Sequence, residues 1–286
     1  MTIAISLKVN DGVVLASDSA ATLLAQGPSG PSVVQVYDNA NKVFNLRKGL
    51  PIGAITWGSG AIGHASTSTL IKDLRARFSG DPAHKDWHVD PQSYSIATIA
   101  ERLKTFIYDE NYVQAFKDWP QKPELGFIVA GYSAGSQRAE EYTIRVDNQG
   151  TCSDPTPVRA IEQCGATWNG EPEAISRLLL GYSPRLRTVL LDKLGVDPAQ
   201  IDAAMQIIQR ELAVPVINDA MPIQDAIDLA GFLVHLTEKY SRYTPGAPTV
   251  GGPIEIAAIT KHEGFKWVQR KYYFTRDLNP PEVPNA

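Results

Sequence analysis

Residues 2–18 read TIAISLKVNDGVVLASD, and this stretch decides the fold. Two short runs rich in apolar and β-branched residues, 2–9 and 13–19, are separated by Asn10, Asp11 and Gly12. An Asn/Asp-Gly pair between such runs is a strong hairpin signal, because these residues tolerate the positive φ that tight turns need. The stretch therefore predicts an antiparallel β-hairpin at the start of the chain.

The rest of the chain alternates between groups of strands and groups of helices. Further strands are predicted at 42–46, 51–57, 125–132, 140–146, 158–163, 254–260 and 265–274, and a loop at 25–32. Helical spacing of apolar residues predicts helices at 61–78 and 95–116, and a helical block at 172–240 in which Asp197-Pro198 caps a helix at 199–212. Strands in hairpins and helices in separate blocks predict an α+β fold of antiparallel sheets covered by helices.

Composition limits the class of protein. The chain has 286 residues, of which 43% are hydrophobic and 20% charged, which is typical of a folded protein. Its net charge of −4 gives no bulk attraction to nucleic acid or an anionic membrane. Cys152 and Cys164 lack the paired spacing of a zinc site, and no run approaches the roughly 18 apolar residues of a membrane span. With no signal-like start, we expect a cytoplasmic protein without nucleic-acid or membrane partners.

Two short motifs suggest enzymes of different classes. Residues 58–63, GSGAIG, match the G-x-G-x-x-G pattern of nucleotide-binding enzymes, although the strand ending in an acidic residue that should follow is missing. Residues 131–135, GYSAG, match the elbow of serine esterases, with Ser133 as nucleophile. A tight glycine turn explains the first motif better. A hairpin turn explains the second better, because a strand-like segment follows it.

The histidines do not indicate a metal site. His84 and His88 are four residues apart, a spacing that binds metals when it lies on a helix. Two Asp-Pro pairs bracket them, so we expect a surface loop and no metal site.

Thr2 is the third candidate nucleophile. Its small side chain permits removal of Met1, which would leave a threonine with a free α-amine of unperturbed pKa near ~7.7–8.0. An amine of that basicity can accept the proton of the neighbouring hydroxyl, so a threonine and its own amine form a nucleophile–base pair.

An ordered set of motifs surrounds this threonine. DGVVLASD at 11–18 is followed by KVFNL at 42–46, Trp57-Gly58 before a helix, TWNGEP at 167–172 and GGPIEIA at 251–257. In this order they resemble the proteasome β-subunit family of N-terminal-nucleophile hydrolases, which includes the bacterial HslV and Anbu relatives. The resemblance implies a four-layer αββα sandwich, in which two antiparallel sheets are flanked by helices.

The resemblance also implies a role for each site residue. Thr2 would be the nucleophile, Lys42 the cation beside it, Asp18 the carboxylate that orients Lys42, and Gly58 the oxyanion donor. Thr22 and Asn169 would have auxiliary or substrate-binding roles, with Asn169 standing where the family has a serine. Asn169 can form hydrogen bonds but cannot relay a proton.

Together these observations predict a threonine endopeptidase or amidohydrolase that needs no cofactor, cleaves peptide bonds and associates with itself into rings. One domain is expected over 2–275, with insertions near 25–41 and 181–222 and a proline-rich tail at 276–286. The alternatives are a catalytically silent ring scaffold, an esterase that uses Ser133, and a nucleotide-binding enzyme that uses residues 58–63. The sequence leaves open whether an ATPase unfoldase is a partner.

Overall fold

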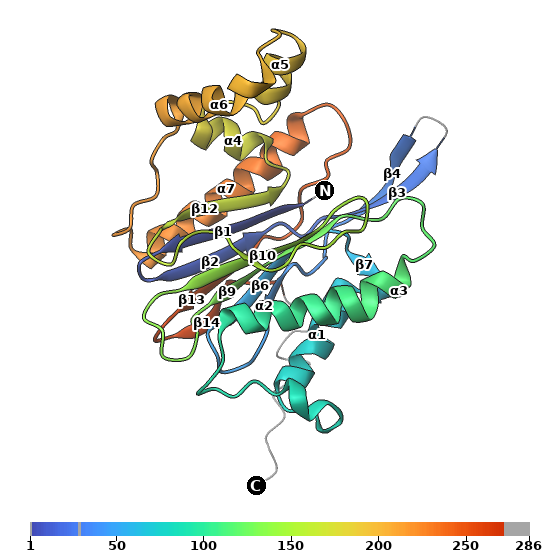
Figure 1. The fold of residues 1–286 in the computed structure, drawn as a ribbon, viewed down its shortest axis with the longest axis vertical. Coiled ribbons are helices and arrows are strands. Elements are labelled where there is room, and N and C mark those ends of the chain that lie inside the picture. Colours follow the sequence, from blue (N-terminus) through green and yellow to red (C-terminus); the bar gives the residue numbers. More distant parts are fainter. Residues whose placement is uncertain (1, 28–29, 272–286) are drawn as a thin grey trace.

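The computed structural model of the protein describes residues 2–27 and 30–271, and its strands form two antiparallel sheets of five strands (Figure 1). The first sheet has the order β12 (Gly165–Gly170), β1 (Ile3–Val9), β2 (Gly12–Ser17), β13 (Glu255–Thr260) and β14 (Gly264–Gln269). The second has the order β11 (Thr156–Pro157), β10 (Glu140–Val146), β9 (Leu125–Gly131), β6 (Ile52–Gly58) and β5 (Val43–Asn45). Two small hairpins, β3 (Ala21–Gly27) with β4 (Gly30–Tyr37) and β7 (Ala61–Ile62) with β8 (Ala65–Ser66), complete the described strands.

Helices cover the outer face of each sheet. Helices α4 (Glu173–Leu180) and α7 (Ile223–Tyr243) lie on the first sheet, and α5 (Leu186–Asp192) and α6 (Pro198–Leu212) lie beyond them (Figure 1). The second sheet is covered by α1 (Thr67–Phe78), by the 3₁₀ turn η1 (Pro82–Trp87), and by one long helix formed by α2 (Ile96–Lys104), the π-helical η2 (Thr105–Tyr112) and α3 (Val113–Ala115). The predicted sandwich of two antiparallel sheets between helical layers is confirmed.

Alternation along β1 explains why the sheets stack. Ile3, Ile5 and Leu7 join the core beneath α4 and α7, while Ala4 joins the core between the two sheets. Successive strand residues point to opposite faces, so a strand that is apolar on both faces has to lie between two layers. Each large aliphatic side chain buried in this way stabilises the fold by about 1.5–3 kcal/mol.

Three predictions of secondary structure are wrong. Residues 25–27 and 30–32 belong to β3 and β4 rather than to a loop, and residues 28–29 are outside the described residues. The helix predicted from residue 61 begins at Thr67, where the Ser66 side chain accepts a hydrogen bond from the Thr69 amide and caps it. Residues 158–163 form no strand, since Arg159 is drawn into a buried ion pair with Glu141.

The other predicted elements are found to within a few residues, although the strand predicted at 265–274 ends at Gln269 and its residues 272–274 lie outside the described residues. Asp197 caps α6 by accepting the Ala199 amide, as expected from Asp-Pro, and Ser95 caps α2 in the same way through Thr98. The insertion predicted at 181–222 contains α5 and α6. The proline-rich tail, 276–286, is outside the described residues, and the single-domain division stays a prediction. Among the described residues no helix is both long enough and apolar enough to cross a bilayer.

Candidate functional site

Thr2 lies at the entrance to β1 and is buried, with 5% of its surface exposed. Its carbonyl oxygen accepts a hydrogen bond from the Glu171 amide at 2.8 Å, which ties it to the end of β12. Gly170 makes this approach possible: its φ is +95°, and a Cβ there would lie 1.9 Å from the Thr2 oxygen. Any other residue at 170 would displace Thr2.

Asp18 follows the end of β2 and is almost completely enclosed. One carboxylate oxygen, Oδ1, accepts the amide of Ile3 at 3.1 Å and the ammonium of Lys42 at 2.6 Å. The other, Oδ2, accepts the amides of Ala20 and Gly251, both at 3.1 Å. Four donors converge on one carboxylate, and one of them belongs to the residue directly after Thr2. Together they fix the position of the carboxylate beside the start of β1.

Lys42 lies just before β5, and its side chain is buried against Asp18. Burial lowers the pKa of Lys42 from its usual value of 10.5, and the Asp18 carboxylate offsets part of that effect. A buried ammonium costs free energy unless it is paired, so Asp18 and Lys42 depend on each other. The structure therefore brings together two predicted site residues and joins them, through the Ile3 amide, to the third, Thr2.

Ser17, which the sequence analysis did not identify as a site residue, also holds the backbone beside Thr2. Its hydroxyl donates to the Ile3 carbonyl at 2.8 Å, while the Ile3 amide is held by Asp18. Both polar backbone groups of Ile3 are thus fixed by neighbours at the end of the second strand. This leaves the backbone beside Thr2 with little freedom.

Gly58 and Thr22 lie on elements that border this region. Gly58 ends β6, which packs against β1 and β12 of the facing sheet. Its φ is +86°, and a Cβ would lie 2.4 Å from the Glu124 carbonyl oxygen, so strand geometry alone requires glycine there. Thr22 lies in β3 opposite Val36. Their roles as oxyanion donor and substrate contact stay predictions.

Asn169 lies on the face of β12 that is turned toward the second sheet. It pairs with Ala4 of β1, and its Oδ1 accepts a hydrogen bond from Arg145 of β10 at 2.8 Å. Because a guanidinium can only donate, this contact fixes which amide atom is the oxygen. The Nδ2 group is buried and, within the described residues, has no hydrogen-bond partner. Nδ2 of Asn169 is therefore a buried hydrogen-bond donor without a partner among the described residues, and it lies between the sheets at the end of β12 nearest Thr2.

The rival nucleophile Ser133 has a structural function. It lies in the loop between β9 and β10, which are antiparallel neighbours, so residues 131–135 form a hairpin connection rather than a strand-to-helix elbow. Its hydroxyl donates to Glu140 at 2.5 Å and accepts the amide of Ile96 at the start of α2 at 3.0 Å. The interpretation as a hairpin turn is confirmed.

The glycine-rich segment 58–63 does not open a helix. The β7–β8 hairpin separates β6 from α1, so the backbone amides of this segment are not at a helix N-terminus. A pyrophosphate in the nucleotide-binding arrangement needs that N-terminus. The geometry therefore does not support the nucleotide-binding alternative.

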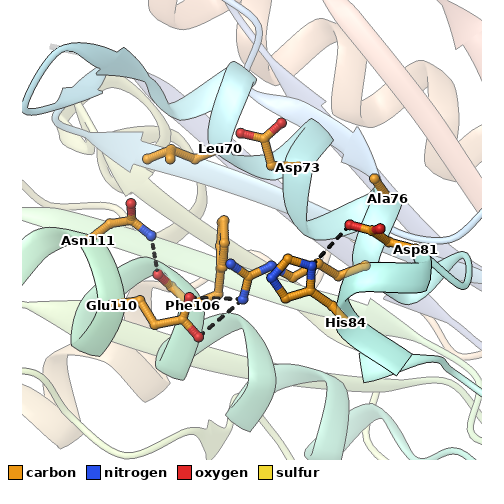
Figure 2. A pocket seen from close by; sticks show the side chains of 9 residues that line it. Leu70, Asp73, Ala76, Asp81, His84, Phe106, Glu110 and Asn111 are labelled. Carbon is orange, nitrogen blue, oxygen red and sulfur yellow. Dashed lines mark hydrogen bonds and ion pairs between the residues drawn. The ribbon is translucent and has the colours of Figure 1, made fainter. Parts of the chain in front are cut away.

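A pocket of about 410 Å³ lies between α1, η1 and η2, and the site residues above do not line it (Figure 2). Figure 2 shows two pairs of partnered groups in its lining: Glu110 accepts two hydrogen bonds from Nη1 of Arg77, and His84 lies 3.0 Å from Asp81. Within the described residues no group of three His, Cys, Asp or Glu could hold a metal ion. His84 lies in η1 with Asp81 as its partner, and His88 follows on the surface.

The fold and the site define an α+β two-sheet sandwich with helices on both outer faces and a buried Asp–Lys pair beside the first residue of its first strand. No protein-family model matches the sequence, and neither does any curated protein. Among solved structures the chain is similar to one described as the helical assembly of the Anbu complex from Pseudomonas aeruginosa. The sequence identity is 14%, the match covers 95% of this chain and 88% of that chain, and the TM-score is 0.48. At this identity and score the likeness carries no information on activity.

Sequence reasoning missed two charged residues near the site. Glu255 and Lys271 form another buried ion pair, with 3.2 Å between carboxylate oxygen and ammonium nitrogen. Glu255 could have been noticed as the one charge in the apolar run 253–259. Lys271 carries no such signal, since it is one of several basic residues near the end of the chain.

Proposed function

We propose that the protein is an N-terminal threonine hydrolase that cleaves amide bonds of peptides through an ester formed on Thr2. The observation that carries the proposal is the chain of contacts from the Ile3 amide to Asp18 and from Asp18 to Lys42. It fixes the backbone directly after Thr2 and holds one cation, Lys42, on the same carboxylate. The resemblance of the ordered motifs to the proteasome β-subunit family supports the same assignment.

In the first half of the proposed reaction the Thr2 hydroxyl oxygen attacks the carbonyl carbon of the substrate amide. Its proton passes to the α-amine that removal of Met1 has freed. The charge on Lys42 lowers the free energy of the alkoxide-like state, and the amide N–H of Gly58 is proposed to stabilise the oxyanion, an effect of about 3–4 kcal/mol in comparable sites. The carbon–nitrogen bond then breaks, and the proton leaves with the product amine.

In the second half, water adds to the ester carbon and gives a proton to the α-amine. The ester carbon–oxygen bond breaks, the Thr2 oxygen regains a proton, and the acid product departs. The unused Nδ2 donor of Asn169 supports an auxiliary role, such as binding this water or a substrate carbonyl. No bound cofactor takes part in either half.

The mass of the intact purified protein tests the proposal directly. We expect the loss of Met1, because an acylated nitrogen has no basic lone pair and cannot accept the hydroxyl proton. Intact-protein mass spectrometry measures this without any substrate. A preparation that retains Met1 in full would contradict the threonine mechanism and favour the silent ring scaffold instead.

We further propose that copies of the chain associate with one another. Helix α6 buries only Ile201 among its own residues, whereas Ile207, Leu212 and Phe232 of α6 and α7 are each at least half exposed. Large apolar side chains that are exposed on two helices of the outer layer support an interface on this side of the molecule. We expect a native mass that is a multiple of 31.2 kDa and falls on Phe232→Asp substitution, measured by light scattering. A monomer at micromolar concentration would contradict self-association.

A further inference from the structure

The Glu255–Lys271 ion pair contacts the same chain segments that carry the Asp18–Lys42 pair. Glu255 begins β13 and pairs in register with Ser17, the residue before Asp18. Lys271 follows β14, and its ammonium is 3.2 Å from the Glu255 carboxylate. Among the described residues, Oε2 of Glu255 makes no hydrogen bond of good geometry, so the contact is chiefly ionic.

Lys271 also holds the two segments that carry the Asp18–Lys42 pair. Its ammonium donates to the hydroxyl of Ser19, which follows Asp18, and to the carbonyl of Ala40, two residues before Lys42, the latter at 2.5 Å. The two segments are joined directly as well, because the Ala40 amide donates to the Ser19 carbonyl at 2.9 Å. One side chain therefore joins the chain around Asp18 to the chain around Lys42.

The charges of the two pairs act on one another. Lys42 has Asp18 beside it, with Lys271 and Glu255 farther off; besides burial, Lys271 lowers the pKa of Lys42 and Glu255 raises it. Burial raises the pKa of Glu255 itself, and Lys271 offsets part of that effect. Two acids and two bases thus form a buried group of four, in which each charge is paired with an opposite one.

We propose that Glu255 and Lys271 are positioning residues, which hold the Asp18–Lys42 pair in place and set the charge around Lys42. The inference rests on the proposed function for its consequence in catalysis. The contacts of Lys271 with Ser19 and Ala40 support it independently of any reaction. Neither residue is placed in contact with substrate.

The experiment measures the titration of the Lys42 side chain by NMR in the full-length protein labelled with ¹³C,¹⁵N-lysine. Lys271→Met should raise the pKa of Lys42, because a nearby positive charge is lost. Lys271→Arg should leave it unchanged, since a guanidinium keeps the charge at every accessible pH. Adding Glu255→Gln to the Lys271→Arg protein should lower the pKa of Lys42, because a negative charge is lost while the cation stays.

The two variants are expected to shift the pKa of Lys42 in opposite directions, and this distinguishes a positioning role from a general loosening of the core. Loosening would admit water, relieve the desolvation of Lys42 and raise its pKa in every variant. A rise in both arms, or no change on Lys271→Met, would overturn the inference. Because the titration needs no turnover, the shifts in the Lys42 pKa test the inference even if Thr2 proves unreactive and the proposed function fails.

A second readout links the pair to the reaction. The rate at which an electrophile modifies Thr2 should fall roughly 10- to 100-fold in Lys271→Met, the range that small displacements of reacting groups cause. Lys271→Arg should restore most of the rate. Lys266→Met, an exposed lysine of β14, is the matched control and should react at the normal rate. Normal labelling of a folded Lys271→Met protein would contradict the positioning role.

Discussion

Substitution of Thr2 by alanine is expected to abolish covalent labelling by an epoxyketone. This reagent forms one bond to a hydroxyl oxygen and a second to the α-nitrogen of the same residue, and alanine lacks the first of these atoms. Alanine is small enough, as threonine is, for removal of Met1, so the amine is formed in both proteins. The measurement is the mass added to the intact protein, which should disappear completely.

The substitution should leave the fold intact. A single hydroxyl contributes about 1 kcal/mol, whereas the anchors of this segment are backbone groups: the Thr2 carbonyl with the Glu171 amide, and the Ile3 amide with Asp18. Circular dichroism and the thermal midpoint of the variant should therefore stay close to those of the parent protein.

Ser133→Ala is the control for the rival nucleophile. Its hydroxyl already has two partners, Glu140 and the Ile96 amide, so its loss should cost some stability of α2 and leave labelling unchanged. A Thr2→Ala protein with full hydrolytic activity, beside an inactive Ser133→Ala protein, would overturn the threonine assignment and move the nucleophile to the β9–β10 loop.

The first hairpin could be predicted because its signals are local: alternation and the Asn-Asp-Gly turn define β1 and β2. Asp18 and Lys42 were predicted as partners from the resemblance of the ordered motifs to a known family, and the structure joins them. The structure adds what a linear pattern cannot contain. The Gly251 amide, 233 residues from Asp18 along the chain, completes the shell of that carboxylate.

The incorrect predictions arise where contacts between distant parts of the chain decide the structure. Residues 158–163 have the composition of a strand, but Arg159 pairs with buried Glu141, and the Ile161 carbonyl accepts the ammonium of Lys8 at 2.8 Å. These tertiary contacts outweigh local β-propensity, which depends strongly on context. Lys271 could not be found for the same reason, since both of its partner segments lie more than 200 residues earlier in the chain.

Loss of one member of the Asp18–Lys42 pair should produce the largest change in stability. Removing one partner of a buried pair leaves an uncompensated charge and typically costs about 3–5 kcal/mol, a large share of the roughly 5–15 kcal/mol that stabilise a domain. The loss in stability should differ between substitution of Lys42 and substitution of Asp18. Lys42→Met leaves Asp18 with three backbone amides as donors, whereas Asp18→Ala strands those three amides and the buried ammonium together.

We therefore expect Asp18→Ala to lower the free energy of unfolding more than Lys42→Met does, with both values measured by urea titration. Asp86→Ala, an exposed carboxylate in η1, is the matched control and should change it little. Labelling of Thr2 should fall strongly in both variants, because Lys42→Met removes the cation and Asp18→Ala releases both the cation and the Ile3 amide. If the two variants unfold like the Asp86→Ala control, the pair does not organise the buried centre of the site. If they are destabilised but labelled at the normal rate, its role is structural and Thr2 reacts without it.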